Sequence, residues 1–198
     1  MSDPRLIVGV VLAAGASSRF GGNKLLATLP DGRMLAEAAC EALMPAVDRL
    51  IAIVRGGSDE LETRLKALGA DVCICPDAHR GMGTSLAFGI NRSADADGWL
   101  IALADMPLVA PGDAIRVAQA LRAGAPIAAP VAGKRRGHPV GLSRRFMGEL
   151  RALDGDVGAR AILAAHADAV VEIPVSDSGS WLDVDTPADL LALHTPGI

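Results

Sequence analysis

Glycines and cationic residues gather directly after the first apolar segment of this 198-residue chain. In VVLAAGASSRFGGNKLL, at positions 10–26, Gly15 opens a polar stretch that contains Arg19 and Lys24. A glycine-rich turn after a strand lets backbone N–H groups converge on an anion, and the two cations add charge beside it. The glycine spacing differs from a Walker A loop and from G-x-G-x-x-G, and Leu25 stands where Walker A has Ser or Thr. These residue types favour a polyphosphate ligand; a flexible polar loop is the alternative for this stretch alone.

Acidic residues follow apolar segments at two other, distant points of the chain. Asp105 comes directly after GWLIALA, and Asp183 and Asp185 lie in SWLDVDTPADLLAL. The second segment reads as a short strand followed by a helix with Thr186 as N-cap and Pro187 at its first position. Each acid alone has an ordinary alternative as a turn or capping residue. Together with the glycine-rich turn they predict a Mg²⁺ site, because carboxylate oxygens suit magnesium that carries a nucleotide.

A third motif, DAHRGMGTSLAFGI, places small and hydroxyl residues before a predicted helix. Gly81, Gly83, Thr84 and Ser85 can offer backbone and hydroxyl hydrogen bonds to a nucleotide base. An ordinary helix cap is the alternative.

A fourth motif, GKRRGHPVGLSRR, is rich in basic residues and follows the fifth predicted strand. It contains Arg136 and His138, which we assign to a second phosphate-binding side of the site. A solvated β-hairpin with exposed charge is the alternative.

Short apolar segments alternate with amphipathic ones along the chain and define the fold that must position these residues. Buried strands are predicted at 6–13, 49–54, 70–74, 98–104 and 125–130, and helices at 34–46, 59–69 and 113–124. The βαβ rhythm predicts one α/β domain over residues 1–198, with a doubly wound, mostly parallel sheet covered by helices on both faces. Ligands of such sheets bind at the carboxyl ends of the strands.

Composition excludes several classes of partner. The formal net charge is -4 and aromatic residues make up 3% of the chain, so we expect no nucleic acid and no membrane surface as partner. The apolar segment from Leu6 to Ala14 is too short to span a bilayer. It resembles the core of a secretory signal, but Asp3 offsets Arg5 before it, and we expect a cytoplasmic protein.

Five motifs in order, LAAGASSRFGGNKLL, RGMGTSLAFGI, LADMP, GHPVGL and DVDTPADL, resemble the MobA-like nucleotidyltransferases, most closely the molybdenum cofactor cytidylyltransferases. The resemblance implies a Rossmann-like fold, Mg²⁺ dependence, and transfer of a nucleoside monophosphate to the terminal phosphate of molybdenum cofactor with release of pyrophosphate. It implies CTP rather than GTP, because the cytidylyl branch reads LAAG where the guanylyl branch reads LAGG, and Ala14 holds the deciding position. Phe20 replaces the usual methionine, which we expect to alter packing more than charge.

The resemblance also assigns roles to individual residues. Arg19, Lys24 and Asp105 are implied as catalytic, and Asp105 and Asp185 as metal ligands, with the choice between Asp183 and Asp185 left open. The backbone from Ala13 to Gly15 would hold base and ribose. The residues assigned to the nucleotide are Leu12, Ala13, Ala14, Gly15, Lys24, Gly81, Gly83 and Ser85, and those assigned to the acceptor are Arg136 and His138.

The implied partners are CTP or GTP, molybdenum cofactor, and a recipient molybdoenzyme or its chaperone. Because a phosphate monoester is largely dianionic at neutral pH, its attack needs no general base. Asp189, in the helix after Asp185, is expected to tolerate substitution. A guanylyltransferase, another small-molecule nucleotidyltransferase, and a non-enzymatic accessory or chaperone protein that binds the cofactor remain as alternatives.

Overall fold

The computed structural model describes residues 5–15, 20–133, 135–175 and 179–193. Eight strands within these ranges form one sheet in the order β3-β2-β1-β4-β7-β5-β6, with β8 on the other side of β5. All pairs among β1 to β4 are parallel, as is β5 with β8, while β7 and β6 run antiparallel to their neighbours. The strands are β1 (Ile7–Ala13), β2 (Arg49–Val54), β3 (Asp71–Ile74), β4 (Gly98–Leu103), β5 (Ile127–Ala132), β6 (Arg135–Arg136), β7 (Val140–Ser143) and β8 (Val170–Pro174).

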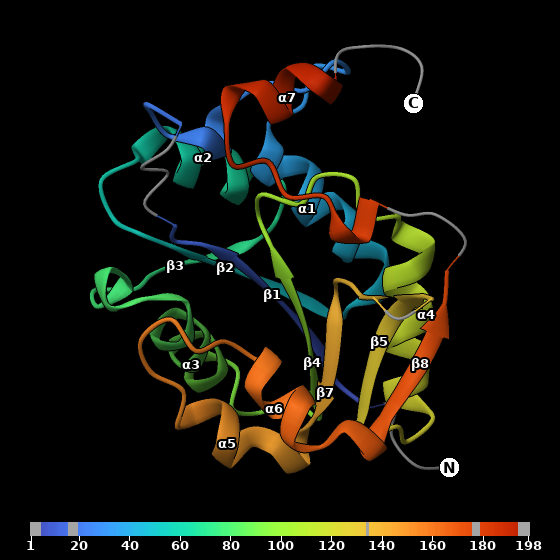
Figure 1. Cartoon of the computed structure of the whole chain (residues 1–198). Helices are drawn as coiled ribbons and strands as arrows, with labels where there is room; N and C mark the ends of the chain where they lie inside the picture. Colours follow the sequence, from blue (N-terminus) through green and yellow to red (C-terminus); the bar gives the residue numbers. More distant parts are fainter. Residues whose placement is uncertain (1–4, 16–19, 134, 176–178, 194–198) are drawn as a thin grey trace.

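Helices cover both faces of the sheet (Figure 1). One face carries α1 (Leu35–Leu43), α2 (Asp59–Ala67) and α4 (Pro111–Arg122), and the other carries α3 (Met82–Arg92), α5 (Met147–Arg151) and α6 (Arg160–Ala165). A last helix, α7 (Pro187–Leu193), packs beside α1. Short 3₁₀ segments complete the chain: η1 (Lys24–Leu26), η2 (Met44–Ala46), η3 (Ala78–Arg80), η4 (Arg144–Phe146), η5 (Ala167–Ala169) and η6 (Gly179–Trp181). The predicted doubly wound, mostly parallel α/β architecture of Rossmann-like type is confirmed.

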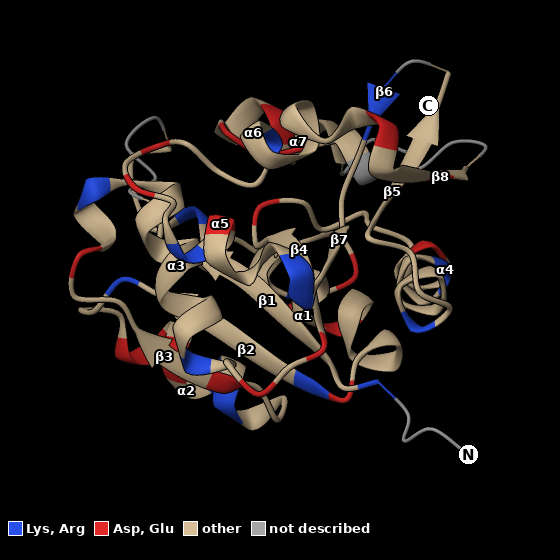
Figure 2. Ribbon diagram, turned by 90° about the horizontal axis from the view of Figure 1, so that it is seen from below, with Lys and Arg blue, Asp and Glu red and all other residues tan. Residues whose placement is uncertain are grey.

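Strand β1 shows why the central strands lack polar alternation. Val8 and Val10 pack with the α3 face, whereas Ile7 and Val11 pack with the α1 face, so both sets of side chains are buried. In Figure 2 β1 and β4 carry no charged residue. The parallel register pairs Leu12 with Leu103, so both strands end at the same edge of the sheet. The residues that follow β1 and β4 therefore meet there.

The segment before α7 differs from the prediction of a short strand. Residues 182–185 have no regular secondary structure. The backbone N–H of Val184 donates to the carbonyl of Asp105 at 2.9 Å, and its side chain is buried between the 20–29 segment, α1 and α7. Asp105, which accepts this hydrogen bond, lies two residues beyond the end of β4. Residues 182–185 therefore contact the loop after β4 and do not form a strand of the sheet.

No helix in the described part of the chain is long and apolar enough to cross a bilayer.

Candidate active site

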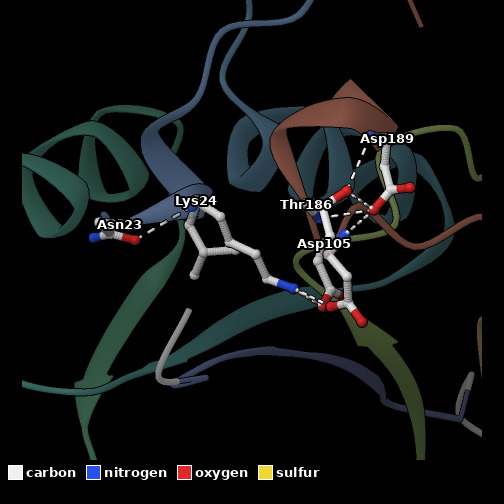
Figure 3. A network of polar contacts seen from close by, with 7 residues as sticks. Asn23, Lys24, Asp105, Thr186 and Asp189 are labelled. Atoms are coloured by element: carbon white, nitrogen blue, oxygen red, sulfur yellow. Dashed lines mark hydrogen bonds and ion pairs between the residues drawn. The ribbon is translucent and has the colours of Figure 1, made fainter. Parts of the chain in front are cut away.

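The ammonium group of Lys24 lies between two carboxylates from distant parts of the chain. Lys24 Nζ is 2.8 Å from Asp105 Oδ2 (Figure 3). It is also 2.8 Å from Asp185 Oδ1. The Lys24 side chain is 9% exposed, against 23% and 34% for Asp105 and Asp185. The structure thus brings together the predicted lysine and both predicted metal ligands.

Asp105 and Asp185 are positioned by one backbone contact. Asp105 follows the end of β4, and its carbonyl accepts the hydrogen bond from the N–H of Val184. This bond places the next residue, Asp185, beside Asp105. Asp183, by contrast, is exposed. Of the two acids between which the sequence left the choice open, Asp185 is the one that contacts Lys24.

Asp189 holds the backbone around Asp185, although the sequence suggested a residue of little consequence. Asp189 Oδ2 accepts hydrogen bonds from the N–H groups of Asp185 at 3.0 Å and Thr186 at 2.7 Å, and from Thr186 Oγ1 at 2.8 Å. The hydrogen bonds from Thr186 and Asp185 lower the pKa of Asp189 below its ordinary value of 3.8. Asp189 therefore fixes the segment that presents Asp185.

Lys24 is held by the 3₁₀ segment that it begins. Asn23 caps this segment, with Oδ1 accepting from the N–H of Leu25 at 3.2 Å, while Leu25 is buried in the core. Burial lowers the pKa of Lys24, but hydrogen bonds and charges from Asp105 and Asp185 outweigh it, so the pKa lies above the ordinary 10.5. Lys24 is therefore an ammonium ion at neutral pH.

The two carboxylates have the chemistry of a magnesium site that is completed by substrate. Asp105 Oδ1 is a buried oxygen that has no hydrogen-bond partner in the described part of the chain. No cluster of three or more His, Cys, Asp or Glu side chains suited to a metal occurs among these residues. Mg²⁺ is commonly held by one or two carboxylates together with substrate phosphates and water. Asp105 and Asp185 fit that donor set.

A cavity of about 300 Å³ opens beside this cluster, at the carboxyl ends of β1, β2 and β4. Its volume is at the lower end of the range of small-molecule sites. Seven residues assigned from the sequence line it: Leu12, Ala14, Gly15, Lys24, Gly81, Ser85 and Asp105. The cavity thus joins the first motif, the third motif and the end of β4.

Other predicted residues lie away from the cavity wall. The side chain of Ala13 packs in the core on the opposite face from Leu12, and Gly83 is not among the residues that line the cavity. Thr84 and Ser85 hydroxyls were expected to face a base, but Thr84 Oγ1 donates to Asp154 at 2.7 Å and Ser85 Oγ to the Gly81 carbonyl at 3.2 Å. Both hydroxyls donate within the protein. Arg19 lies outside the described residues.

The two residues assigned to the acceptor are not brought together in the cavity. Arg136 lies in β6, a basic strand coloured blue in Figure 2, and its guanidinium is 3.6 Å from Glu172 of β8. His138 lies before β7, with Nδ1 3.3 Å from the carbonyl of Ile101. Burial lowers the pKa of His138, opposed in part by that carbonyl and by the charge of Asp105, so the imidazole is neutral at neutral pH.

Sequence reasoning did not assign seven residues of the cavity wall: Leu25, Arg55, Ala78, His79, Met82, Leu103 and Asp156. Arg55 directly follows β2, so its place at the carboxyl edge was available from the strand pattern. Asp156 lies between α5 and α6, outside all of the motifs, and no local sequence pattern indicates that it lines the cavity.

Comparison with known proteins places the chain in a family. A model of the MobA-like NTP transferase domain matches residues 9–170. Relatives along nearly the whole length are the purine catabolism protein PucB of Bacillus subtilis, 32% identical over 96% of each chain, and nicotine blue oxidoreductase of Paenarthrobacter nicotinovorans, 30% identical over 97% of this chain and 98% of the relative. A protein of Haloferax mediterranei named "probable molybdenum cofactor guanylyltransferase" is 34% identical over 52% of this chain and 50% of its own.

The crystal structure of Rv0371c from Mycobacterium tuberculosis has a TM-score of 0.83 and 32% identity, covering 96% of this chain and 98% of that one. The same protein in complex with manganese has a TM-score of 0.79 and 30% identity, over 95% and 97% of the two chains. The extent of the domain match, together with these relatives, shows that the chain belongs to the MobA-like NTP transferase family and is a nucleotidyltransferase of that family.

Proposed function

We propose that this protein transfers CMP from CTP to the terminal phosphate of molybdenum cofactor. In this reaction an oxygen of the acceptor phosphate forms a bond to the α-phosphorus, and the bond between α-phosphorus and the bridging oxygen breaks, so pyrophosphate leaves with its electron pair. The observation that carries the proposal is the cluster of Lys24, Asp105 and Asp185 beside a cavity of about 300 Å³. This cluster lies at the carboxyl ends of the strands, where ligands of such sheets bind, and a triphosphate bound there would contact it.

Lys24 supplies the fixed positive charge. Its ammonium group is held by two hydrogen-bonded carboxylates at one wall of the cavity, and Arg55 contributes a second cation to the lining. Cations placed where charge develops on the α-phosphate and on the departing pyrophosphate stabilise the transition state. Arg19 remains assigned to the same task from its place in the glycine-rich stretch and from the family resemblance.

Asp105 and Asp185 would hold the divalent cation, which we propose to be Mg²⁺. When bound, the ion neutralises phosphate charge and polarises the phosphoryl oxygens. Support comes from the unpartnered buried Oδ1 of Asp105 and from the manganese complex of the relative from Mycobacterium tuberculosis. The carboxylates would then share their charge between Lys24 and the cation.

The acceptor needs no base from the protein, because its phosphate is already largely dianionic at neutral pH. His138 is uncharged at neutral pH, so it adds no charge on the side of the site that we assign to the acceptor. Arg136 remains our assignment for the acceptor's phosphate. Its 3.6 Å ion pair with Glu172 is longer than a hydrogen bond, so a phosphate can replace the carboxylate at little cost.

CTP is proposed over GTP on the LAAG sequence and on the small residues Gly81 and Ser85 in the cavity wall. The relative named "probable molybdenum cofactor guanylyltransferase" favours GTP as the second candidate. The test is incubation of the protein and Mg²⁺ with each of the four nucleoside triphosphates and molybdenum cofactor, with pyrophosphate measured and the product identified by mass spectrometry.

A cytidine dinucleotide of the cofactor, formed with one equivalent of pyrophosphate, is the expected result. A guanosine product would contradict the choice of CTP while keeping the reaction. Tight binding of the cofactor without pyrophosphate would favour an accessory protein. The oxidation-reduction suggested by the name of the nicotine blue relative yields no pyrophosphate, so the same assay separates it from nucleotidyl transfer.

A further inference from the structure

A four-residue segment between α5 and α6, residues 154–157, is bound to the amino-terminal end of α3. We call it the strap. The carbonyl of Gly155 accepts from the N–H of Gly83 at 2.7 Å, and the N–H of Gly155 donates to Thr84 Oγ1 at 3.1 Å. Thr84 Oγ1 in turn donates to Asp154, which also pairs with Arg80. Backbone and side chains of one motif therefore fix the strap at several points.

The two glycines of this motif are required by the strap. A Cβ atom on Gly83 would lie 2.2 Å from the carbonyl oxygen of Val157, and one on Gly81 would lie 2.4 Å from the carbonyl carbon of Gly155. Gly81 also has a φ of +129°, which side chains rarely adopt. The R-G-M-G-T sequence thus binds another part of the protein, in addition to any contact with a ligand.

The docked strap brings Asp156 to the wall of the cavity. Asp156 lines the same cavity as Lys24 and Asp105, and its Oδ1 lies directly over Gly81, 2.4 Å from the ideal Cβ position of that residue. Asp105 forms an ion pair with Lys24, whereas Asp156 lies next to Gly81 at the amino-terminal end of α3. The cavity therefore has a second carboxylate wall, separate from the proposed metal ligands.

We infer that Asp156 is a specificity-determining residue that selects a nucleobase carrying an amino group. The inference rests on the proposed function, in which the triphosphate lies at Lys24 and the base lies toward α3. An ionised carboxylate only accepts hydrogen bonds. It therefore attracts the exocyclic amine of cytosine and repels the carbonyl oxygen that uracil presents at the same position. Asp156 is exposed at the rim of the cavity, so a base that lacks this N–H group loses one hydrogen bond to the carboxylate but leaves no buried group unpaired.

The test compares CTP with UTP on the wild type, Asp156→Asn and Asp168→Asn. Asp168 is exposed in η5 and does not line the cavity, so its substitution controls for the loss of one surface charge. Kd values are measured calorimetrically with Mg²⁺ and without acceptor, and kcat/KM by pyrophosphate release.

We expect the CTP-to-UTP preference to fall by about tenfold or more in Asp156→Asn, because the amide can donate to the uracil carbonyl. Asp168→Asn should keep the wild-type ratio. An unchanged ratio in Asp156→Asn, with wild-type affinity for CTP, would overturn the role of Asp156 and leave the proposed function intact. A wild type that binds and uses GTP alone would contradict the cytidylyl assignment. In that case GTP and ITP, which differ by one amino group, replace CTP and UTP in the same comparison of the three proteins. Absence of binding for every nucleoside triphosphate would contradict the proposed function itself, and with it this inference.

Discussion

Lys24 Nζ lies 2.8 Å from Asp105 Oδ2 although the two residues are 81 positions apart, and the same ammonium group reaches Asp185 at 2.8 Å. One ammonium group paired with two carboxylates leaves the cluster with one net negative charge, which a divalent cation can offset. The same carboxylates are the proposed ligands of the divalent cation, so Lys24 and the cation share their ligands.

Replacement of Lys24 by methionine should lower both stability and activity. The variant removes the ammonium group that lies between two carboxylates, and we expect about 1–3 kcal/mol of lost unfolding free energy, measured by urea denaturation in EDTA. Millimolar Mg²⁺ or Mn²⁺ should restore more stability in the variant than in the wild type, because a divalent cation can replace the missing charge. Equal stability of the two proteins in EDTA would show that the ion pairs contribute little.

For the activity of Lys24→Met we expect a fall in kcat/KM of about 10²-fold or more.

Asp189→Ala should lower kcat although Asp189 does not contact the cavity. Removal of its carboxylate frees the N–H groups of Asp185 and Thr186, so Asp185 loses its fixed position. Asp189→Asn keeps an oxygen that can accept these hydrogen bonds, so its kcat should lie between those of Asp189→Ala and the wild type. A loss of kcat that follows the hydrogen bonds in this way would indicate that Asp189 acts by positioning Asp185. If the alanine variant folds and turns over at the wild-type rate, Asp189 does not position Asp185.

The stabilising effect of Asp189 should disappear in acid. Its pKa is lower in the folded chain than the ordinary 3.8, so its contribution is full above that value and is lost as the pH falls through the folded value. The difference in unfolding free energy between wild type and Asp189→Asn should therefore be constant from pH 7 to about 5 and shrink at lower pH. A difference that grows on acidification would contradict the hydrogen bonds described for this carboxylate.

Gly83→Ala and Gly112→Ala should have opposite effects on stability. Alanine normally stabilises a helix by about 0.5–1 kcal/mol relative to glycine, and a Cβ on Gly112 in α4 meets no atom within 4 Å. In α3 the Cβ of residue 83 would collide with the carbonyl of Val157, so Gly83→Ala should destabilise the protein by displacing the strap. Urea denaturation of both variants measures the two effects. Equal stabilisation would mean that the strap does not dock as described.

Much of the fold was predictable because buried strands and amphipathic helices leave local periodicities. β2 has the predicted bounds. Asp105 was predicted as a site residue because it follows the apolar segment that forms β4. The segment at Asp185 was predicted wrongly as a strand, since its conformation depends on a hydrogen bond between Val184 and Asp105 that no local pattern encodes. The same limit hid the strap, whose partners at Gly83 and Thr84 lie about 70 residues earlier in the chain.

The roles of residues in the third motif show a related limit. Small and hydroxyl residues before a helix suit a nucleotide base and equally suit a docked loop, and sequence alone does not separate the two. The structure shows the hydroxyl of Thr84 bound to Asp154 and no room for a side chain at Gly83.

The central claim is that Lys24, Asp105 and Asp185 act as one centre for nucleotidyl transfer, and Mg²⁺-dependent pyrophosphate release from CTP and molybdenum cofactor tests it most directly. Asp105→Asn and Asp185→Asn should each reduce turnover severely, and the double variant should lose much less than the product of the single effects. Asp183→Asn, two residues from Asp185 but exposed, should retain wild-type turnover. Folded single variants of Asp105 and Asp185 with wild-type turnover and unchanged Mg²⁺ dependence would contradict the claim.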